Sequence, residues 1–355
     1  MNKISIVAPV YKIKETYLRQ SISSMINQTL REIEIILVDD GSPDLCGNIC
    51  DEYALLDSRI KVIHQDNQGV SVARNTGIAA VTGEYTCFVD PDDWIESDMC
   101  DKAYKQAKKM DCDILFFSFV DEYENKSIIP KKRKSSRLTD DDVKKMQIDV
   151  IYMTKKRLED RSLNASAPWG KIYRTDFLRA NQLMFKPGVL KGQDTLFNIY
   201  VYECKPKCAF DDFVGYHYRQ WTNSISNRYN PNITEIMYNL TQHMYSFIQS
   251  THENDDQYKN ALYCGVLRRF GDCTKLFFAH RQNSLPLHKK VVALESYLEQ
   301  PIIHLSLQNV SITQLGGIKF KISIWMLKQK WILIYLLLHI YLRKIDTVLR
   351  GKHKY

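Results

Sequence analysis

The segment Gly83–Trp94, "GEYTCFVDPDDW", joins the pattern of a buried strand to three carboxylates. Residues 83–90 have the aromatic and β-branched character of a strand. Asp90, Asp92 and Asp93 then fall within four positions. Because like charges this close repel each other, the three acids need a role that compensates the cost. They could cap a helix, hold a cation or perform acid–base chemistry.

Strand and helix patterns alternate throughout the first hundred residues. Some segments carry apolar residues at helical spacing, and others are short runs rich in β-branched residues. Strands are expected at 3–11, 32–41, 59–65 and 83–90, and helices at 15–30, 45–57 and 69–81. This alternation with short connections predicts an α/β fold built on a parallel, doubly wound sheet.

Polar residues gather where the expected strands end. Asp39 and Asp40 end the second strand, Asp90 follows the fourth, and Tyr11 follows the first. Ligands of such sheets bind outside the carboxyl ends of the strands, so these residues are expected on one cleft. No GxGxxG or GxxxxGK[ST] segment is present, which argues against dinucleotide and P-loop sites.

Length and cysteine content limit the class of protein further. With 355 residues and 45% hydrophobic side chains, the chain can form one large domain or two. Nine cysteines occur without a CxxC pair, and the sequence opens directly on a strand pattern. These features favour free thiols in a reducing cytoplasm over cysteines that form a disulfide framework or a zinc site.

The positive charge is concentrated at the carboxyl end of the chain. Nine of the 49 Lys and Arg residues and one of the 41 Asp and Glu residues lie in 317–355, so 40 of each sign remain in the first 316 positions. A neutral body argues against nucleic-acid binding. The uncharged run 331–342 is too short to span a bilayer. The basic, aromatic segment in 317–355 is therefore expected to form a helix that lies on an anionic membrane surface. The alternative is a helix that packs in the core of the carboxyl-terminal region.

Seven segments of the chain, in order, resemble a large enzyme family. They are "SIVAPVYK", "ILVDDGSPD", "NQGVSVARNTG", "GEYTCFVDPDDW", "PWGKIYR", "GQDTLFN" and "YHYRQWTNSIS", across residues 5–226. Together they resemble the inverting family 2 glycosyltransferases of the GT-A fold, of the type that builds bacterial surface polysaccharides. The resemblance implies a GT-A domain at 1–228. A helical region at 229–316 and the basic, aromatic tail at 317–355 are expected to follow.

The resemblance implies a nucleotide-diphosphate sugar as donor, with UDP as the expected nucleotide, and Mn²⁺ or Mg²⁺ as cofactor. A departing diphosphate gains negative charge, and hard oxygen ligands suit these cations. The resemblance assigns the metal to Asp90, Asp92 and His217. The role of Asp93 is left open: it could act at this site, or it could be the N-cap of a following helix.

Further positions match the family's donor-binding elements. The resemblance assigns contacts with the nucleotide sugar to Pro9, Val10, Tyr11, Asp40, Arg74, Asp90 and Arg219. Two of these have a plainer alternative: Asp40 could cap the turn before Gly41, and Arg74 could be a surface arginine of its helix.

Asp194 matches the family's general base, which takes the proton of the acceptor hydroxyl. The family usually carries Glu-Asp here, whereas this chain has Gln193-Asp194. Loss of the neighbouring charge is expected to lower the pKa of Asp194. The sugar or acceptor pocket is assigned to Trp94, Trp169, Lys171 and Gln193. Packing of Trp169 at a strand start is the alternative.

The sequence therefore predicts a metal-dependent inverting glycosyltransferase. It would act on a glycan or lipid-linked glycan in polysaccharide biosynthesis, in the cytoplasm at the inner face of the cell membrane. Gln193 motivates an alternative, a non-catalytic nucleotide-sugar or glycan binding module with a degenerate GT-A site. A nucleotidyltransferase is disfavoured because the first loop, "APVYKIKETY", contains no glycine.

Overall fold

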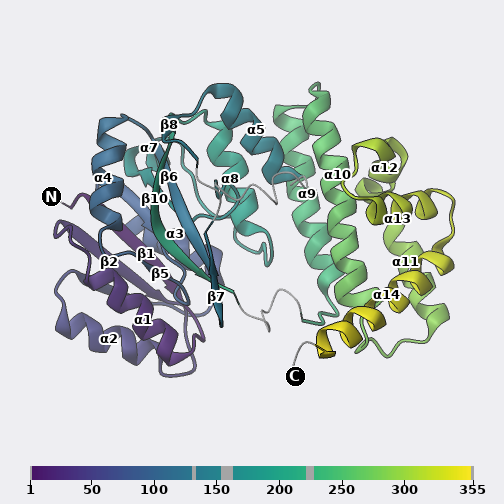
Figure 1. Ribbon diagram of the computed structural model, residues 1–355, viewed down its shortest axis with the longest axis horizontal. Helices are drawn as coiled ribbons and strands as arrows, with labels where there is room; N and C mark the ends of the chain where they lie inside the picture. The colour runs from purple at the N-terminus through teal and green to yellow at the C-terminus, as the bar shows by residue number, and fades with distance from the viewer. Residues whose placement is uncertain (1, 130–132, 153–162, 221–227, 353–355) are drawn as a thin grey trace. The chain divides into compact units, whose positions relative to one another are not determined.

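The computed structural model describes residues 2–129, 133–152, 163–220 and 228–352 (Figure 1). The chain forms two compact units, one of residues 1–150 and 159–222 and the other of 151–158 and 223–355. The break at 222 lies close to the boundary expected at 228. The segment 317–355 belongs to the second unit rather than forming a separate part.

The amino-terminal half of the sheet has the expected parallel arrangement. Its strands are β1 (Ile4–Val10), β2 (Ile33–Asp39), β3 (Ile60–His64) and β4 (Tyr85–Phe88). They lie in the order β3-β2-β1-β4, and each neighbouring pair is parallel. Every residue of β1 is buried, which explains its unbroken apolar pattern. The carboxyl ends of β1, β2 and β4 consequently lie at one edge.

The other half of the sheet contains antiparallel as well as parallel neighbours. Its strands are β5 (Trp94–Ile95), β6 (Ile114–Tyr123), β7 (Lys126–Ile128), β8 (Ser136–Arg137), β9 (Lys171–Arg174) and β10 (Cys208–Arg219). β9 is antiparallel to both β4 and β6, and β5 is antiparallel to β10, whereas β10 and β6 are parallel. The whole sheet is therefore mixed, and the parallel order predicted for the strands of the first hundred residues is confirmed for β1 to β4.

Helices cover this sheet (Figure 1). They are α1 (Glu15–Ile26), α2 (Cys46–Leu56), α3 (Val70–Ala80), α4 (Met99–Lys109), α5 (Asp140–Ile151), α7 (Thr175–Ala180) and α8 (Gln193–Glu203). α3 lies directly on β1, since a Cβ added at Gly77 would fall 2.3 Å from Val7 Cγ1. Only glycine permits this close approach, which brings the side chains of α3 towards the edge of the sheet.

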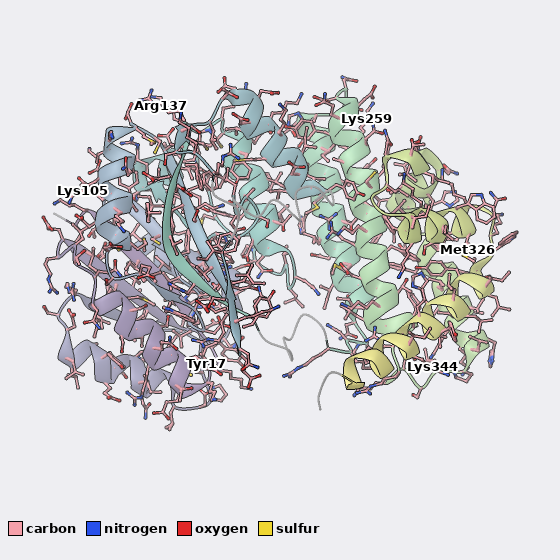
Figure 2. All side chains as sticks on the ribbon, viewed as in Figure 1. Tyr17, Lys105, Arg137, Lys259, Met326 and Lys344 are labelled. Carbon is pink, nitrogen blue, oxygen red and sulfur yellow. The ribbon has the colours of Figure 1, made fainter. Side chains whose placement is uncertain are left out.

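The second unit is helical, as expected. It contains α9 (Ile233–Thr251), α10 (Asp256–Cys273), the π-helix η2 (Thr274–Phe278), α11 (Leu287–Leu298), α12 (Pro301–Asn309), the 3₁₀-helix η3 (Ile312–Gln314), α13 (Ile318–Lys328) and α14 (Ile332–Lys352). Figure 2 marks Met326 on α13 and Lys344 on α14. Within the part of the chain that the structure describes, none of the helices combines the length and apolar character that crossing a bilayer requires.

Helix α14 has two different apolar faces. Tyr335 and Leu336 are fully buried, and the Tyr335 hydroxyl lies 2.8 Å from Thr274 Oγ1. Leu333, Leu337 and Tyr341, spaced four residues apart, are 48%, 46% and 62% exposed. One face therefore packs in the unit, as the core-helix alternative predicts, while the other presents apolar side chains to the solvent.

All nine cysteines are free thiols, and all but Cys204 are buried. Two pairs have CxxxC spacing, Cys46/Cys50 and Cys204/Cys208, and neither belongs to a metal-binding group among the described residues. The cysteines thus contribute mainly to packing.

Candidate active site

Asp40 connects the edge of the sheet to the start of α3. It is 2% exposed and accepts hydrogen bonds from the backbone amides of Gln68 (2.9 Å) and Gly69 (2.8 Å) and from the side chain of Gln65 (2.8 Å). Asp39, by contrast, caps the turn by accepting from the Ser42 amide. The capped-turn alternative therefore describes Asp39, whereas Asp40 fixes the loop that leads into α3.

The first loop has one exposed aromatic ring. Pro9 and Val10 are buried in β1, and the Val10 carbonyl accepts a hydrogen bond from the Asp40 amide. Tyr11, directly after the strand, is 40% exposed. Of these three predicted donor contacts, only Tyr11 presents an exposed side chain at the edge of the sheet.

Arg74 joins two acids that are far apart in the sequence. Its Nη2 donates to Asp90 Oδ1 at 2.8 Å, and its Nη1 donates to Asp194 Oδ1. The Arg74 side chain is 3% exposed, whereas Asp90 and Asp194 are 23% and 29% exposed. Asp90 follows β4, and Asp194 lies in the first turn of α8, where the helix dipole favours a carboxylate. The alternative of a surface arginine is therefore wrong.

The surroundings of Asp194 shift its affinity for a proton. Burial raises the pKa of the Asp194 carboxyl, and Arg74 opposes that rise. A carboxylate with a raised pKa is a stronger proton acceptor than an exposed aspartate, which suits a general base. The net direction is upward even though Gln193 contributes no charge beside it.

Asp93 does not cap a helix. Trp94 and Ile95 form β5, which pairs with Tyr216 and His217 of β10, and the next helix, α4, starts at Met99. Asp93 is 1% exposed and accepts from the Tyr216 hydroxyl at 2.7 Å and from the Arg219 amide at 2.8 Å. Burial and its two neighbouring aspartates raise the pKa of Asp93 well above the usual range. The helix-cap interpretation was wrong because a long-range strand pair forms there instead.

Replacing Asp93 with Ala is expected to destabilise the first unit by about 3 kcal/mol. The change leaves two buried donors, the Tyr216 hydroxyl and the Arg219 amide, without an acceptor. D93N, which keeps one oxygen and the shape of the side chain, should cost clearly less. Urea unfolding of both variants measures the difference, and equal stability of D93A and wild type would contradict this role.

Two predicted site residues of β10, His217 and Arg219, stack on Trp94 of β5. The His217 ring lies parallel to Trp94 at 4.9 Å, and the Arg219 guanidinium lies 4.6 Å from Trp94 on one side and 4.1 Å from Tyr17 on another. His217 Nδ1 and Nε2 lie 2.8 and 2.9 Å from Glu122 and Glu96 carboxylate oxygens. Both ring nitrogens are thus engaged by carboxylates in this structure, so metal binding by His217 would require these contacts to break.

Arg219 also contacts the acidic loop directly. Its Nε donates to the Asp92 carbonyl at 2.8 Å, and its Nη2 donates to Gln20 Oε1 at 2.7 Å. The Asp92 side chain is partly exposed. Arg219 therefore holds the backbone of the loop that carries Asp90 and Asp92.

Two of the predicted pocket residues lie inside the unit. Trp169 is 6% exposed and stacks on Tyr216 with centroids 4.6 Å apart. Lys171 is fully buried, with Nζ 3.3–3.4 Å from Tyr202, Asn198 and Ala165 oxygens, and burial lowers its pKa well below the usual range. These two side chains support the site from behind, as the packing alternative for Trp169 predicts.

Gln193 differs from Trp169 and Lys171. It follows Gly192, which has the left-handed φ of 78°, and begins α8. Its Oε1 is buried and has no hydrogen-bond partner among the described residues. A buried, unsatisfied amide oxygen beside Asp194 is suited to accept a hydrogen bond from a ligand.

Two residues of the site were not singled out from the sequence. The Tyr216 hydroxyl donates to Asp93 and accepts from the Asp90 amide at 3.1 Å. Asn198 Nδ2 donates to the carbonyls of Asp194 and Ser166, both at 2.9 Å. The position of Asn198, four residues after Asp194 on one helix, is a signal that could have found it.

The acids at the edge of the sheet include ligands of the kind that a divalent cation prefers. Among the described residues, no group of three or more His, Cys, Asp or Glu side chains is arranged to hold a metal. Mg²⁺, however, is usually held by one or two carboxylates together with substrate phosphates. Asp90 and Asp92 supply that number of oxygen ligands, so the donor set fits a cation that binds with a phosphate-bearing substrate.

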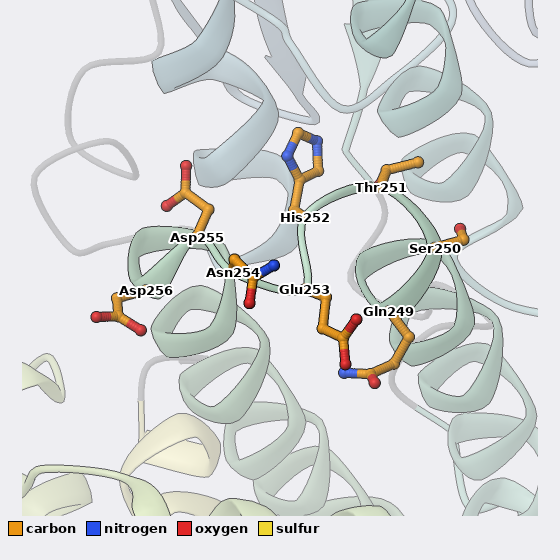
Figure 3. Close-up of a pocket in the computed structure, with 8 residues that line it drawn as sticks. All are labelled: Gln249, Ser250, Thr251, His252, Glu253, Asn254, Asp255 and Asp256. Atoms are coloured by element: carbon orange, nitrogen blue, oxygen red, sulfur yellow. The ribbon is translucent and has the colours of Figure 1, made fainter.

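A separate pocket of 570 Å³ lies in the second unit (Figure 3). It is lined by the consecutive residues 249–256, which form the end of α9, the turn and the start of α10. It contains none of the residues predicted to act on a substrate. His252 there stacks on Tyr258 at 3.7 Å, which stabilises the turn.

The parallel strands β1 to β4 and the acidic edge agree with the GT-A fold expected from the sequence. The model of the family "Glycosyl transferase family 2" matches residues 5–180. The chain is 32% identical over 264 residues to the protein named "Putative glycosyltransferase EpsH" of Bacillus subtilis (strain 168), with 72% of each chain covered. The chain belongs to glycosyltransferase family 2 and is a transferase.

Other similar proteins agree with this assignment. Glycosyltransferase GlyA of Streptococcus pneumoniae serotype 4 is 34% identical over 228 residues, which are 63% of this chain and 32% of GlyA. The crystal structure of S. aureus TarS 1-349 in complex with UDP-GlcNAc superposes with a TM-score of 0.64 at 19% identity, covering 96% of this chain and 92% of TarS 1-349. The structural likeness confirms the predicted GT-A fold.

Proposed function

We propose that the protein is a metal-dependent, inverting glycosyltransferase that moves a sugar from a UDP-linked donor to a glycan or lipid-linked glycan in polysaccharide biosynthesis. The observation that carries this proposal is the link through Arg74 between Asp90, beside the proposed cation site, and Asp194, the proposed base. Solved structures of TarS with UDP-GlcNAc and with UDP support a uridine nucleotide.

On this proposal, the donor binds at the edge formed by the ends of β1, β2 and β4. Tyr11 covers the base with its exposed ring, Asp40 contributes to the uracil site, and Trp94 and Gln193 line the sugar or acceptor pocket. Asp90 and Asp92 would hold Mn²⁺ or Mg²⁺, which supplies positive charge for the departing diphosphate. A fold relative solved with GDP-Man and Mn²⁺, at a TM-score of 0.51, supports the choice of metal.

Asp194 acts as the general base of the transfer. The acceptor hydroxyl gives its proton to a carboxylate oxygen of Asp194 while its own oxygen forms the bond to the anomeric carbon. The bond between that carbon and the diphosphate oxygen breaks, and the electron pair leaves with the diphosphate. Attack opposite the leaving group inverts the anomeric configuration.

The pH profile should report the Asp194 carboxylate. Only the ionised form accepts a proton, so kcat/KM is expected to fall tenfold per pH unit below the pKa of Asp194. Because burial raises that pKa, the decline should begin above the usual range of an aspartate. Initial rates across an acidic pH series measure it. A flat profile, in a protein that stays folded, would contradict the role of Asp194.

Calorimetry separates this function from the non-catalytic alternative that Gln193 suggests. Titration of UDP and a UDP-sugar, each with and without Mn²⁺, should show binding that depends on the metal. Release of UDP in the presence of an acceptor then identifies an enzyme. Binding that is never followed by release or transfer would favour a nucleotide-sugar binding module.

We further propose that α13 and α14 contact an anionic membrane surface. Exposed apolar side chains lie on both helices and on the connection between them, among them Trp325 of α13, Trp331 of the connection, and Leu337 and Tyr341 of α14. Trp325 and Trp331 pack edge to face at 5.0 Å, and lysines flank them in the sequence. Aromatic and aliphatic groups beside basic side chains suit the headgroup region of a bilayer. This location would bring the enzyme close to a lipid-linked acceptor.

Two acidic substitutions in the exposed face of α14 should release the protein from vesicles. L337E with Y341E replaces apolar contacts by charges that anionic lipids repel, and is expected to weaken binding at least about tenfold. L55E with L56E on α2 is the matched control, since both leucines are exposed, at 90% and 73%. Sedimentation with phosphatidylglycerol vesicles measures the effect, and equal binding of the two double variants would contradict the membrane face.

A further inference from the structure

Arg74 is the point at which the two halves of the proposed active site meet. Its two terminal nitrogens bond to different carboxylates, Nη2 to Asp90 and Nη1 to Asp194. These acids are 104 positions apart in the sequence and belong to the loop after β4 and the start of α8. The planar guanidinium is suited to hold two acids in a fixed relative geometry.

The Arg74 side chain is held firmly by its surroundings. Its guanidinium lies 5.0 Å from the centroid of the Phe185 ring. Phe185 is itself fixed to α3 by two hydrogen bonds of 2.8 Å, one in each direction, between its backbone and the Asn75 side chain. With Arg74 only 3% exposed, its orientation is set before any ligand binds.

Each terminal nitrogen of Arg74 donates to a different acid of the protein, so the guanidinium has a direct part in positioning the two carboxylates. From this geometry we infer that Arg74 is a positioning residue, which orients the Asp194 carboxylate for proton acceptance and ties it to Asp90, and is not a contact of the nucleotide. The inference rests on the proposed function of Asp194. It replaces the expectation of a donor-binding Arg74.

The proposed role follows from the charge change at Asp194. When Asp194 takes the proton of the acceptor hydroxyl, it becomes neutral, and Arg74 keeps one ionised partner in Asp90. One oxygen of Asp194 stays bonded to Arg74, so the other oxygen is directed to the acceptor. Lysine at position 74 would keep the charge but could not reproduce the two-pronged contact.

The R74K variant tests this inference by separating turnover from donor binding. We expect kcat to fall by about 10²-fold, because the base is no longer aligned. The Kd for UDP with Mn²⁺, measured by calorimetry, should stay within about threefold of wild type. R59K is the matched control, since Arg59 makes a comparable pair with Asp57 at 2.6 Å, and it should leave both kcat and Kd unchanged.

F185L provides a second variant, which keeps the charge of Arg74 and removes the aromatic ring beside its guanidinium. It should lower kcat with an unchanged Kd for UDP, even if R74K fails to fold. A loss of UDP affinity of tenfold or more in R74K, or unchanged kcat in both folded variants, would overturn the inference. A wild-type protein that binds UDP but never transfers sugar would instead overturn the proposed function, so the two failures are distinct.

Discussion

D194N should lower kcat by about 10³-fold while UDP affinity stays close to that of wild type. The amide keeps the size of the side chain and can accept from Arg74, but it cannot take the proton of the acceptor hydroxyl. Radioactive sugar transfer measured under saturating donor gives kcat directly. Calorimetry with UDP and Mn²⁺ gives the affinity that should not change.

D176N is the matched control for this substitution. Asp176 is an exposed acid in the first turn of α7 and has no contact with the proposed site. Its activity should equal that of wild type. Full activity of D194N would move the general base elsewhere. A loss of UDP binding in D194N would mean that Asp194 contacts the donor.

The second large effect is expected for D92N. Removing one carboxylate from the proposed cation site should lower turnover by about 10²-fold and raise the Mn²⁺ concentration needed for half-maximal rate. This shift in metal dependence distinguishes D92N from D194N, whose metal dependence should not change. A Mn²⁺ titration of initial rates measures it.

D92N should keep the contact between Arg219 Nε and residue 92, because that contact uses the backbone carbonyl. Thermal unfolding verifies that the variant stays folded. A D92N variant with wild-type turnover and wild-type Mn²⁺ dependence would remove Asp92 from the cation site.

The parallel part of the sheet could be predicted because its signals are local. Short apolar runs alternate with amphipathic segments from β1 to β4, and parallel order then places Asp40 and Asp90 at one edge. The direction of β9 could not be predicted in this way. Strand direction depends on pairing between segments distant in the sequence, and the pattern of "KIYR" is the same in either direction.

Long-range contacts also explain the other differences. The sequence around Asp93 allows a helix cap there. In the structure, however, Trp94 and Ile95 pair with β10, which lies more than 120 positions away. The burial of Lys171 and the two acidic partners of Arg74 likewise arise from packing between elements. The two faces of α14 follow from which side meets the rest of its unit, which helical spacing alone does not specify.

Nucleotide release from a set of sugar donors tests the central claim most directly. Wild-type protein with Mn²⁺ and a glycan or lipid-linked acceptor should release UDP from at least one UDP-sugar, and faster than it releases nucleotide from GDP- or dTDP-sugars. D194N in the same assay should release almost none. Absence of release from every donor, in a protein that still binds UDP, would contradict the account.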